Sequence, residues 1–154
     1  MKSNMKIYMY LFVLLLFTVG TLEATSLRDT TYGSVRVSEV TSIYDGDTFR
    51  VNIDGYPALI GSRMGIRVNG IDTPEMRGKC QQEKALARAA KQFTVAQLRA
   101  AKTIELRNMK RGKYFRVVAD VYVDGKDLGK MLIDRGLAVV YDGGHKAKDW
   151  CIKK

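Results

Sequence analysis

The first half of the chain alternates apolar and polar residues in the way that is typical of half-buried β-strands. This alternation predicts three strands, at residues 35–44, 48–53 and 66–71. Between the second and the third, Asp54-Gly55 is predicted to form a hairpin turn. Residues 56–65, which include one proline and two glycines, predict an irregular strand or a loop.

The period of the pattern changes over residues 81–102, and this change predicts a long helix. Apolar residues recur there at helical spacing between charged ones: Leu86, Ala89, Ala90, Phe93, Ala96 and Ala100. Two further strands are predicted at 104–108 and 114–123, and a short helix at 127–135 that ends at Gly136.

This order of elements predicts a fold that is mainly β with helices. The arrangement that fits is a five-stranded OB-fold barrel, with one helix after the third strand and a shorter C-terminal helix. A flat sheet of five exposed strands fits less well, because its edges would need protection from other chains.

The N-terminal residues have the composition of an export signal. Lys2 and Lys6 precede an apolar run at 7–19, and Ala24 offers a small residue for cleavage. The run is shorter than the roughly 20 residues that span a bilayer. The sequence therefore predicts a signal peptide at 1–24, a flexible segment at 25–34 and one folded domain at 35–154. Cleavage after Gly20 and an uncleaved membrane anchor are the alternatives.

The predicted signal peptide implies a protein that is exported, either secreted or periplasmic. After cleavage we expect no stable membrane partner. Nothing in the sequence requires a dimer, so a monomer is expected.

The positive charge of the chain favours a polyanionic partner. The formal net charge is +10, and it becomes +9 when the two lysines and one glutamate of residues 1–24 are removed. Lysine and arginine side chains that neutralise phosphates gain free energy by releasing counterions. Nucleic acid fits such a charge, as do anionic lipid and cell-wall polymer.

The two cysteines, Cys80 and Cys151, are an even number in a chain that is predicted to be exported. This combination favours a disulfide between them. In the chain-entropy model, closing a loop of this length stabilises the fold by about 4 kcal/mol. Two separate thiols are the alternative.

The sequence contains a single histidine, His145, and this argues against catalytic mechanisms that depend on histidine. Nucleophiles activated by histidine, zinc hydrolases with two histidines and ribonucleases with paired histidines all need residues that the chain lacks. No phosphate-binding loop of the Walker type is present, which argues against an NTPase. His145 itself is expected at the surface. Acids and arginines remain as the candidates for chemistry.

Two aspartates stand out because the strand patterns direct them toward the interior. Asp47 opens a strand whose odd-numbered residues face the core, and Asp72 shares the parity of the apolar residues Ile66 and Val68. If the two strands are neighbours, the carboxylates meet at one end of the barrel. Ionised carboxylates in a partly dry site repel, so that one of them protonates or a cation neutralises both. An all-oxygen site suits a hard divalent ion such as Ca²⁺.

The residues after Asp72 could complete such a site. Pro74 fixes the backbone just beyond the strand, so the carbonyl of Thr73 and the carboxylates of Asp72 and Glu75 could gather around one point. The alternative is that this stretch only starts a loop before the helix.

Five short motifs follow one another along the chain. They are Asp45-Gly46-Asp47-Thr48, then Arg67 leading into Ile71-Asp72-Thr73-Pro74-Glu75, then Lys113-Tyr114 before Arg116, then Asp124-Gly125-Lys126, and finally Arg135-Gly136-Leu137-Ala138. Each motif is weak alone. In this order and at this spacing they resemble the staphylococcal nuclease, or thermonuclease, family over almost all of the chain after the predicted signal.

The resemblance implies an OB-fold enzyme that uses calcium to hydrolyse phosphodiester bonds in DNA and RNA with little sequence specificity, leaving 3′-phosphate ends. By motif position, Asp47 and Asp72 are similar to the carboxylate ligands of the ion. The carbonyl of Thr73 is similar to a third ligand.

The resemblance also implies roles for residues around the phosphate. Glu75 is similar to the residue that orients or deprotonates the attacking water, and Arg67 and Arg116 are similar to the pair that grips the phosphate. Lys113 and Tyr114 occupy the positions expected to bind the nucleotide. Two alternatives have no hydrolysis: a catalytically inactive nucleic-acid-binding module on the same OB scaffold, and a cationic surface-binding protein.

The chain departs from the family pattern in three places. Phe115 stands where the family usually has glycine, and residues 56–65 form a longer segment than in the type enzyme. The sequence also ends soon after Trp150, so a long C-terminal helix is absent or reduced to a turn, and a disulfide could replace its anchoring role.

Strand geometry raises a separate difficulty. Strict alternation along residues 66–71 places Arg67 on the face opposite Asp72, and a bend or bulge is needed to bring them together.

Overall fold

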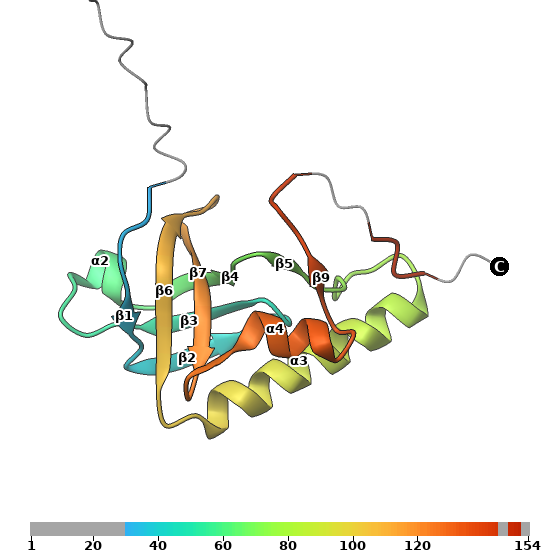
Figure 1. Cartoon of the computed structure of the whole chain (residues 1–154), viewed down its shortest axis with the longest axis horizontal. Helices are drawn as coiled ribbons and strands as arrows, with labels where there is room; N and C mark the ends of the chain where they lie inside the picture. The colour runs from blue at the N-terminus through green and yellow to red at the C-terminus, as the bar shows by residue number, and fades with distance from the viewer. Residues whose placement is uncertain (1–29, 145–147, 152–154) are drawn as a thin grey trace, which may run out of the picture.

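A curled β-sheet forms the centre of the protein, and two longer helices pack along it (Figure 1). The structure is a computed structural model that describes residues 30–144 and 148–151. The predicted signal peptide at 1–24, residues 25–29 and His145 lie outside the described residues.

The described residues form nine strands, where the sequence predicted five. The five longer ones are β2 (Glu39–Ile43), β3 (Thr48–Asn52), β4 (Met64–Val68), β6 (Ile104–Arg111) and β7 (Arg116–Val123). The other four have two residues each: β1 (Val35–Arg36), β5 (Ile71–Asp72), β8 (Lys126–Asp127) and β9 (Val139–Val140). The longer strands fall where strands were expected. The extra ones arise because two predicted strands are each divided by a bend or turn, and because short pairings form around the C-terminal helix.

The main sheet has the strand order β1-β6-β7-β4-β3-β2, with β8 paired to β7, and β5 and β9 form a separate pair. The pairing of β4 with β7 is parallel and the others are antiparallel. The Val37 N–H donates to the carbonyl of Ile104 on β6, and the next N–H, that of Ser38, donates to the carbonyl of Asn52 on β3, both at 2.9 Å. Neighbouring residues therefore bond to opposite ends of the sheet, which curls it in the manner expected of an OB-like fold.

The helices are α2 (Ala58–Gly61), α3 (Gln81–Ala100) and α4 (Leu128–Asp134). The expected long and short helices are confirmed as α3 and α4. The short α2 was not predicted, because its segment was expected to be an irregular strand or loop. Asp54-Gly55 does form a turn, but the chain passes through α2 before it reaches β4, so the turn is not a two-residue hairpin.

The core lies between the sheet and the inner faces of α3 and α4. Its most buried side chains include Phe49, Ile66, Leu106, Leu128 and Leu132. Burying each of these stabilises the fold by about 1.5–3 kcal/mol. In the described part of the chain, none of the helices is both long and apolar enough to cross a membrane.

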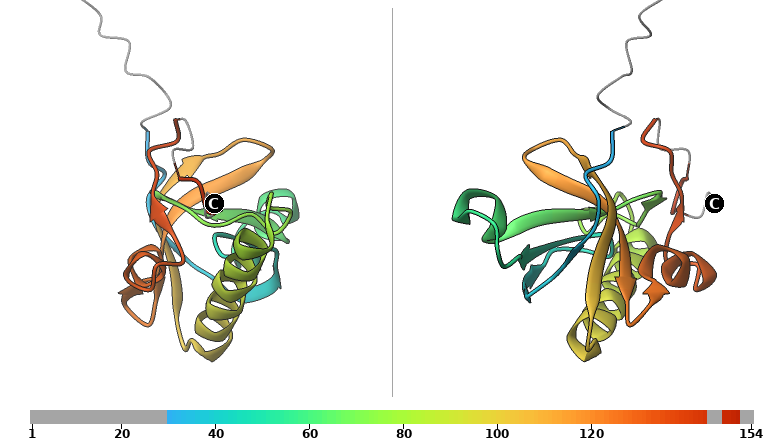
Figure 2. Two further views of the ribbon diagram at one scale, coloured as in Figure 1. Left: turned by 90° about the vertical axis from the view of Figure 1, so that its right-hand side faces the viewer. Right: turned by 60° about the vertical axis from the view of Figure 1, so that its left-hand side comes forward.

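Figure 2 shows where the sheet leaves space for a site. The tip of the β6–β7 hairpin and α2 lie on the same side of the sheet in both views, and α4 lies on the other. Along β4, Met64, Ile66 and Val68 are buried, so Gly65 and Arg67 face away from the core. This outer face receives the side chains of the candidate site.

Candidate active site

Asp47 is held rigidly by its neighbours at the start of β3. Its side chain is buried, and Oδ1 accepts hydrogen bonds from Arg67 Nη1 at 2.7 Å and from the Thr48 hydroxyl at 2.8 Å. Oδ2 accepts from the backbone N–H and the hydroxyl of Thr73, at 3.2 and 3.1 Å. Thr48 pairs with Arg67 across β3 and β4, which is why the carboxylate and the guanidinium meet.

Arg67 also reaches the second aspartate. Its Nη2 donates to Oδ1 of the buried Asp72 at 3.1 Å, so one guanidinium bridges two carboxylates from separate strands. A planar guanidinium can donate parallel bonds in this way, whereas an ammonium cannot. The expected meeting of Asp47 and Asp72 is present, and Arg67 is the cation between them.

A turn removes the difficulty that strand alternation raised for Arg67 and Asp72. The predicted strand at 66–71 is divided: β4 ends at Val68, Asn69 and Gly70 form a turn, and β5 begins at Ile71. Gly70 has φ of +73°, a conformation that glycine adopts without strain. Residues on either side of this turn do not share one alternation, so Arg67 and Asp72 can approach each other.

Asp45 is a third carboxyl group beside this pair. Its Oδ1 accepts the N–H of Asp47 at 3.1 Å. The pKa of Asp45 is raised from 3.8 to about 7, mainly by burial of the carboxyl group and next by the charge of the nearby Asp47. Sequence reasoning named Asp45 only within the first motif and gave it no role. The Asp-x-Asp spacing was the available signal, because both acids then precede the same buried strand.

The donors here fit a hard divalent cation in chemical type. Asp47 Oδ1 and Asp72 Oδ1 both lie within 3.1 Å of nitrogens of one guanidinium, and Ca²⁺ prefers carboxylate and carbonyl oxygens. The carboxylates of Asp45, Asp47 and Asp72 nonetheless do not all lie within 4.8 Å of one another. Among the described residues, the group whose ligand atoms lie within 4.8 Å of one another is Cys80, Glu83 and Cys151. Those two sulfurs form a disulfide, so they lack the thiolates that bind metals.

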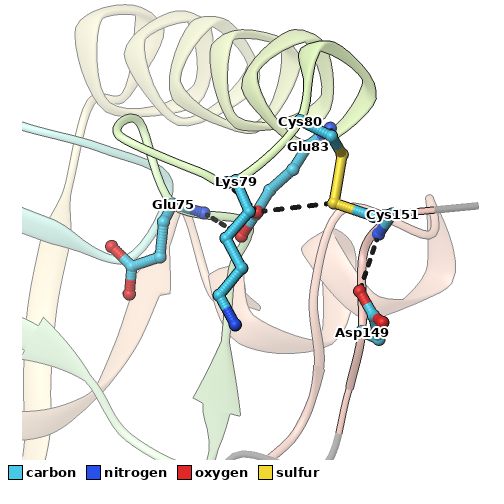
Figure 3. The surroundings of a disulfide bond; sticks show 6 residues. All are labelled: Glu75, Lys79, Cys80, Glu83, Asp149 and Cys151. Carbon is cyan, nitrogen blue, oxygen red and sulfur yellow. Dashed lines mark hydrogen bonds between the residues drawn. A yellow bond between two sulfur atoms is a disulfide. The ribbon is translucent and has the colours of Figure 1, made fainter.

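Glu75 lies in the short loop that joins β5 to α3. Glu83 of α3 organises this loop: its Oε2 accepts the N–H of Lys79 at 2.8 Å, and its Oε1 accepts the N–H of Glu75 at 3.4 Å. The N–H of Gly78 closes the loop onto the carbonyl of Glu75 at 2.8 Å. Figure 3 shows the carboxylate of Glu75 directed away from Glu83 and the disulfide.

The disulfide predicted between Cys80 and Cys151 is present (Figure 3). Cys80 is also the N-cap of α3, where its Sγ accepts the N–H of Glu83 at 3.4 Å. Cys151 Sγ lies 4.0 Å from Glu83 Oε2. The bridge therefore fixes the C-terminal segment against the loop that carries Glu75. Sequence reasoning missed Glu83, although a glutamate three residues after an N-cap is a known capping pattern.

Arg116 lies on the same face of the sheet as Arg67. It pairs with Gly65 of β4 in the parallel register, and Arg67 is two residues further along that strand. Gly65 leaves room for the stem of Arg116, whose Cγ is 3.0 Å from the place where a Cβ would stand. Its Nε donates to the carbonyl of Lys113 at 3.4 Å. In the part of the chain that the structure describes, Arg116 forms no ion pair with a carboxylate.

Lys113 and Tyr114 lie in the loop before β7, whereas the sequence placed the start of a strand at residue 114. The ring centroid of Tyr114 is 5.7 Å from the guanidinium carbon of Arg116. Both residues therefore adjoin Arg116.

The staphylococcal nuclease homologue family matches residues 65–152 of this sequence, which is more than half of the chain. This chain belongs to that family. The matched range contains Arg67, Asp72, Thr73, Glu75 and Arg116, while Asp47 precedes it.

Curated relatives of this staphylococcal nuclease homologue carry endonuclease names. It is 32% identical over 127 residues to a probable endonuclease of Schizosaccharomyces pombe, covering 68% of this chain and 55% of that protein. It is 32% identical over 133 residues to probable endonuclease lcl3 of Schizosaccharomyces japonicus (70% and 56%). It is 29% identical over 123 residues to probable endonuclease LCL3 of Pyricularia oryzae (67% and 48%). The chain thus spans about half the length of the curated relatives it matches.

Proposed function

We propose that this protein is a nuclease that hydrolyses phosphodiester bonds of DNA and RNA with little sequence specificity, depends on calcium and leaves 3′-phosphate ends. The observation that supports this most is the guanidinium of Arg67, which meets Asp47 and Asp72 on the same sheet face as Arg116. Membership of the nuclease family and the endonuclease names of the relatives also support it.

The two arginines suit a phosphate in the transition state. Attack on a phosphodiester builds negative charge on its equatorial oxygens, and donors fixed in advance lower that barrier. Ion pairs with Asp47 and Asp72 restrain the guanidinium of Arg67. The stem of Arg116 packs against Gly65. Removing one such donor typically lowers the rate by about 10²–10³.

Glu75 is the group we assign to the attacking water. A carboxylate that accepts or orients a water proton contributes about 10²–10⁴ in rate. The hydrogen bonds from Glu75 and Lys79 to Glu83 fix the backbone from which this carboxylate projects.

Asp47, Asp72 and the carbonyl of Thr73 would hold the calcium ion. When bound, the ion supplies positive charge to the phosphate and the attacking oxygen. Arg67 donates hydrogen bonds to both aspartates, and these bonds fix the direction of the two carboxylates.

Export and a monomeric state belong to the same proposal. Export rests on the apolar run at 7–19 behind two lysines, which lies outside the described residues. The monomer rests on a sequence in which nothing requires a dimer. Mass measurement of the protein from culture supernatant or periplasm tests both the cleavage and the compartment. Sedimentation of the purified protein tests the monomer.

The activity is tested with plasmid DNA and with RNA, in calcium and in EDTA, using purified protein. We expect nicking in calcium, loss of it in EDTA and a drop of at least about a hundredfold in Glu75→Gln. Glu39→Gln is the matched control, since Glu39 is exposed on β2 and bonds to Asn52. Unchanged cutting in EDTA would reject the calcium dependence. Tight binding without cutting would favour the catalytically inactive nucleic-acid-binding module.

The chemistry of the ends is read from the products. DNA with a 3′-phosphate is not extended by a polymerase until a phosphatase has removed that group. Products that extend without phosphatase would contradict the assigned position of cleavage.

A further inference from the structure

A groove of about 740 Å³ adjoins the candidate active site on the outer face of the sheet. Residues of β2, β3 and β4 form its floor. Leu59 of α2 forms part of one wall, and Tyr114, Phe115 and Arg116 before and on β7 form another. Figure 2 shows α2 and the tip of the β6–β7 hairpin on the same side of the sheet.

The groove is continuous with the site through two shared residues. Thr48 lines the groove, and its hydroxyl donates to Asp47 Oδ1 at 2.8 Å. Arg116, which we assign to the phosphate, also lines it. A nucleic acid strand with a phosphate at Arg116 therefore has its neighbouring nucleotide within reach of the groove.

Large apolar side chains at the groove remain exposed to solvent. The exposed fractions are 58% for Tyr44, 87% for Tyr114, 60% for Phe115 and 77% for Leu59. Exposed rings and aliphatic chains that gather around one groove offer a surface for a flat apolar ligand.

The backbone at Phe115 indicates that its exposure is imposed by the hairpin. Tyr114 and Phe115 have φ of 57° and 56°, in the left-handed region that non-glycine residues adopt at a cost of about 1 kcal/mol or more each. The hairpin fixes this tip, because the N–H of Gly112 donates to the carbonyl of Arg116 at 2.7 Å. Both rings are thus displayed at the groove instead of being packed into the core.

The groove is lined by positively charged side chains, which favour a flat ligand that also carries negative charge. Arg50, Arg63 and Arg116 line it, and none of its lining residues is acidic. Arg50 lies beside Gly65 in the β3–β4 register and donates from Nη1 to the carbonyl of Arg63 at 3.3 Å. Apolar surface together with three guanidiniums matches a nucleotide, which has a flat base and an anionic phosphate.

We propose that this groove binds one unpaired base of the substrate strand next to the scissile phosphate, with Phe115 and Leu59 in contact with the base. This inference rests on the proposed function and names a subsite for it. A base in a duplex is covered on both faces by its neighbours, so occupation of the groove requires a base that has left the stack.

The test measures binding and not cutting. Anisotropy of labelled single-stranded oligonucleotides is recorded in EDTA, for the wild type, Phe115→Gly and Leu59→Ala. Removing one stacking contact weakens binding of a single strand by about 5- to 100-fold. Tyr32→Ala is the control, because Tyr32 is an exposed aromatic residue outside the groove.

A series of oligonucleotides with one abasic position locates the base. We expect the affinity difference between wild type and Phe115→Gly to disappear when a particular base is missing. If the variants bind every intact and abasic strand as the wild type does, the subsite is rejected even if the protein cuts DNA. If the base-dependent difference is found in a protein that does not cut, the subsite holds and the hydrolytic function fails.

Discussion

The carboxylate of Glu83 accepts the backbone N–H of Lys79 at 2.8 Å, and this bond holds the loop from which Glu75 projects. Glu83 is buried, so loss of its carboxylate leaves backbone donors without an acceptor. We infer that Glu83 positions Glu75 and does not itself contact substrate.

We expect Glu83→Ala to lower kcat by about tenfold with little change in KM, because binding energy is unaffected when a positioned group loosens. Glu83→Gln should recover part of kcat, since the amide oxygen can still accept one N–H. Steady-state kinetics on a short oligonucleotide measure both values. Gln92→Ala, exposed on the same helix, serves as the control. A rise in KM alone would contradict the positioning role.

The disulfide should contribute largely to stability. Cys80 and Cys151 are separated by 71 residues, and closing a loop of this size removes entropy from the unfolded chain. Replacing both cysteines with serine should lower the free energy of unfolding by about 4 kcal/mol. Urea unfolding of wild type with and without reductant measures the same difference without mutation. A reduced wild type as stable as the oxidised protein would contradict it.

Gly46 is expected to tolerate no side chain, because α3 packs directly on the turn before β3. A Cβ on Gly46 would lie 2.8 Å from the Cβ of Ala90, and the Thr94 hydroxyl already donates to the Gly46 carbonyl at 2.7 Å. Gly46→Ala should destabilise by about 1–3 kcal/mol.

Ala90→Gly in the Gly46→Ala background tests the cause of that loss. It removes the opposing methyl group, so the double variant should be more stable than the sum of the single changes predicts. Purely additive effects in urea unfolding would place the strain elsewhere.

Arg67→Ala should destabilise the calcium-free protein by about 3 kcal/mol, because Asp47 and Asp72 are buried and lose the cation between them. Added calcium should raise the melting temperature of the variant more than that of wild type. Arg50→Ala is the control, since Arg50 lies on the neighbouring strand without an acidic partner among the described ion pairs. Equal calcium shifts in both proteins would argue against an ion at these aspartates.

Asp124 gives the fold a pH dependence that is independent of the active site. The backbone N–H of Thr103 donates to its carboxylate at 2.8 Å, and this bond is the main reason that its pKa lies below the ordinary 3.8. A lowered pKa means that the charged form is favoured by folding. The stability it contributes is present above the unfolded pKa and is lost as the pH falls through the folded value.

We therefore expect Asp124→Asn to be less stable than wild type at pH 6 and to approach it at pH 3. Urea unfolding at both pH values measures the difference. Asp54→Asn, in another Asp-Gly turn, controls for the loss of one charge. A gap between Asp124→Asn and wild type that is equal at the two pH values would contradict the linkage.

The periodicity of the sequence was enough to predict the longer elements. Residues 81–100 repeat at helical spacing over many turns, so local pattern alone identifies α3. The meeting of Asp47 and Asp72 was also predicted. The buried alternation along β3 explains the inward direction of Asp47, but the parity of Asp72 with Ile66 and Val68 does not explain its position, because the turn at residues 69–70 interrupts that alternation.

Features that depend on distant partners were not predictable. The chain bends at Val37-Ser38 because β6 and β3 offer separate partners there, and no local signal marks that bend. Tyr114 and Phe115 have strand-forming side chains, yet the hairpin holds them in a left-handed loop. Arg67 can bridge Asp47 and Asp72 only because the chain turns at Gly70. A prediction that assumes strict alternation along residues 66–71 does not include this turn.

The parallel register between β4 and β7 has a consequence for synthesis. Gly65 and Arg116 are neighbours in the sheet but far apart along the chain. β7 must emerge from the ribosome before Arg116 can pack beside β4. The two guanidiniums therefore remain apart while the chain is being synthesised up to that point. The phosphate contacts proposed for these two arginines can therefore form only after β7 has emerged.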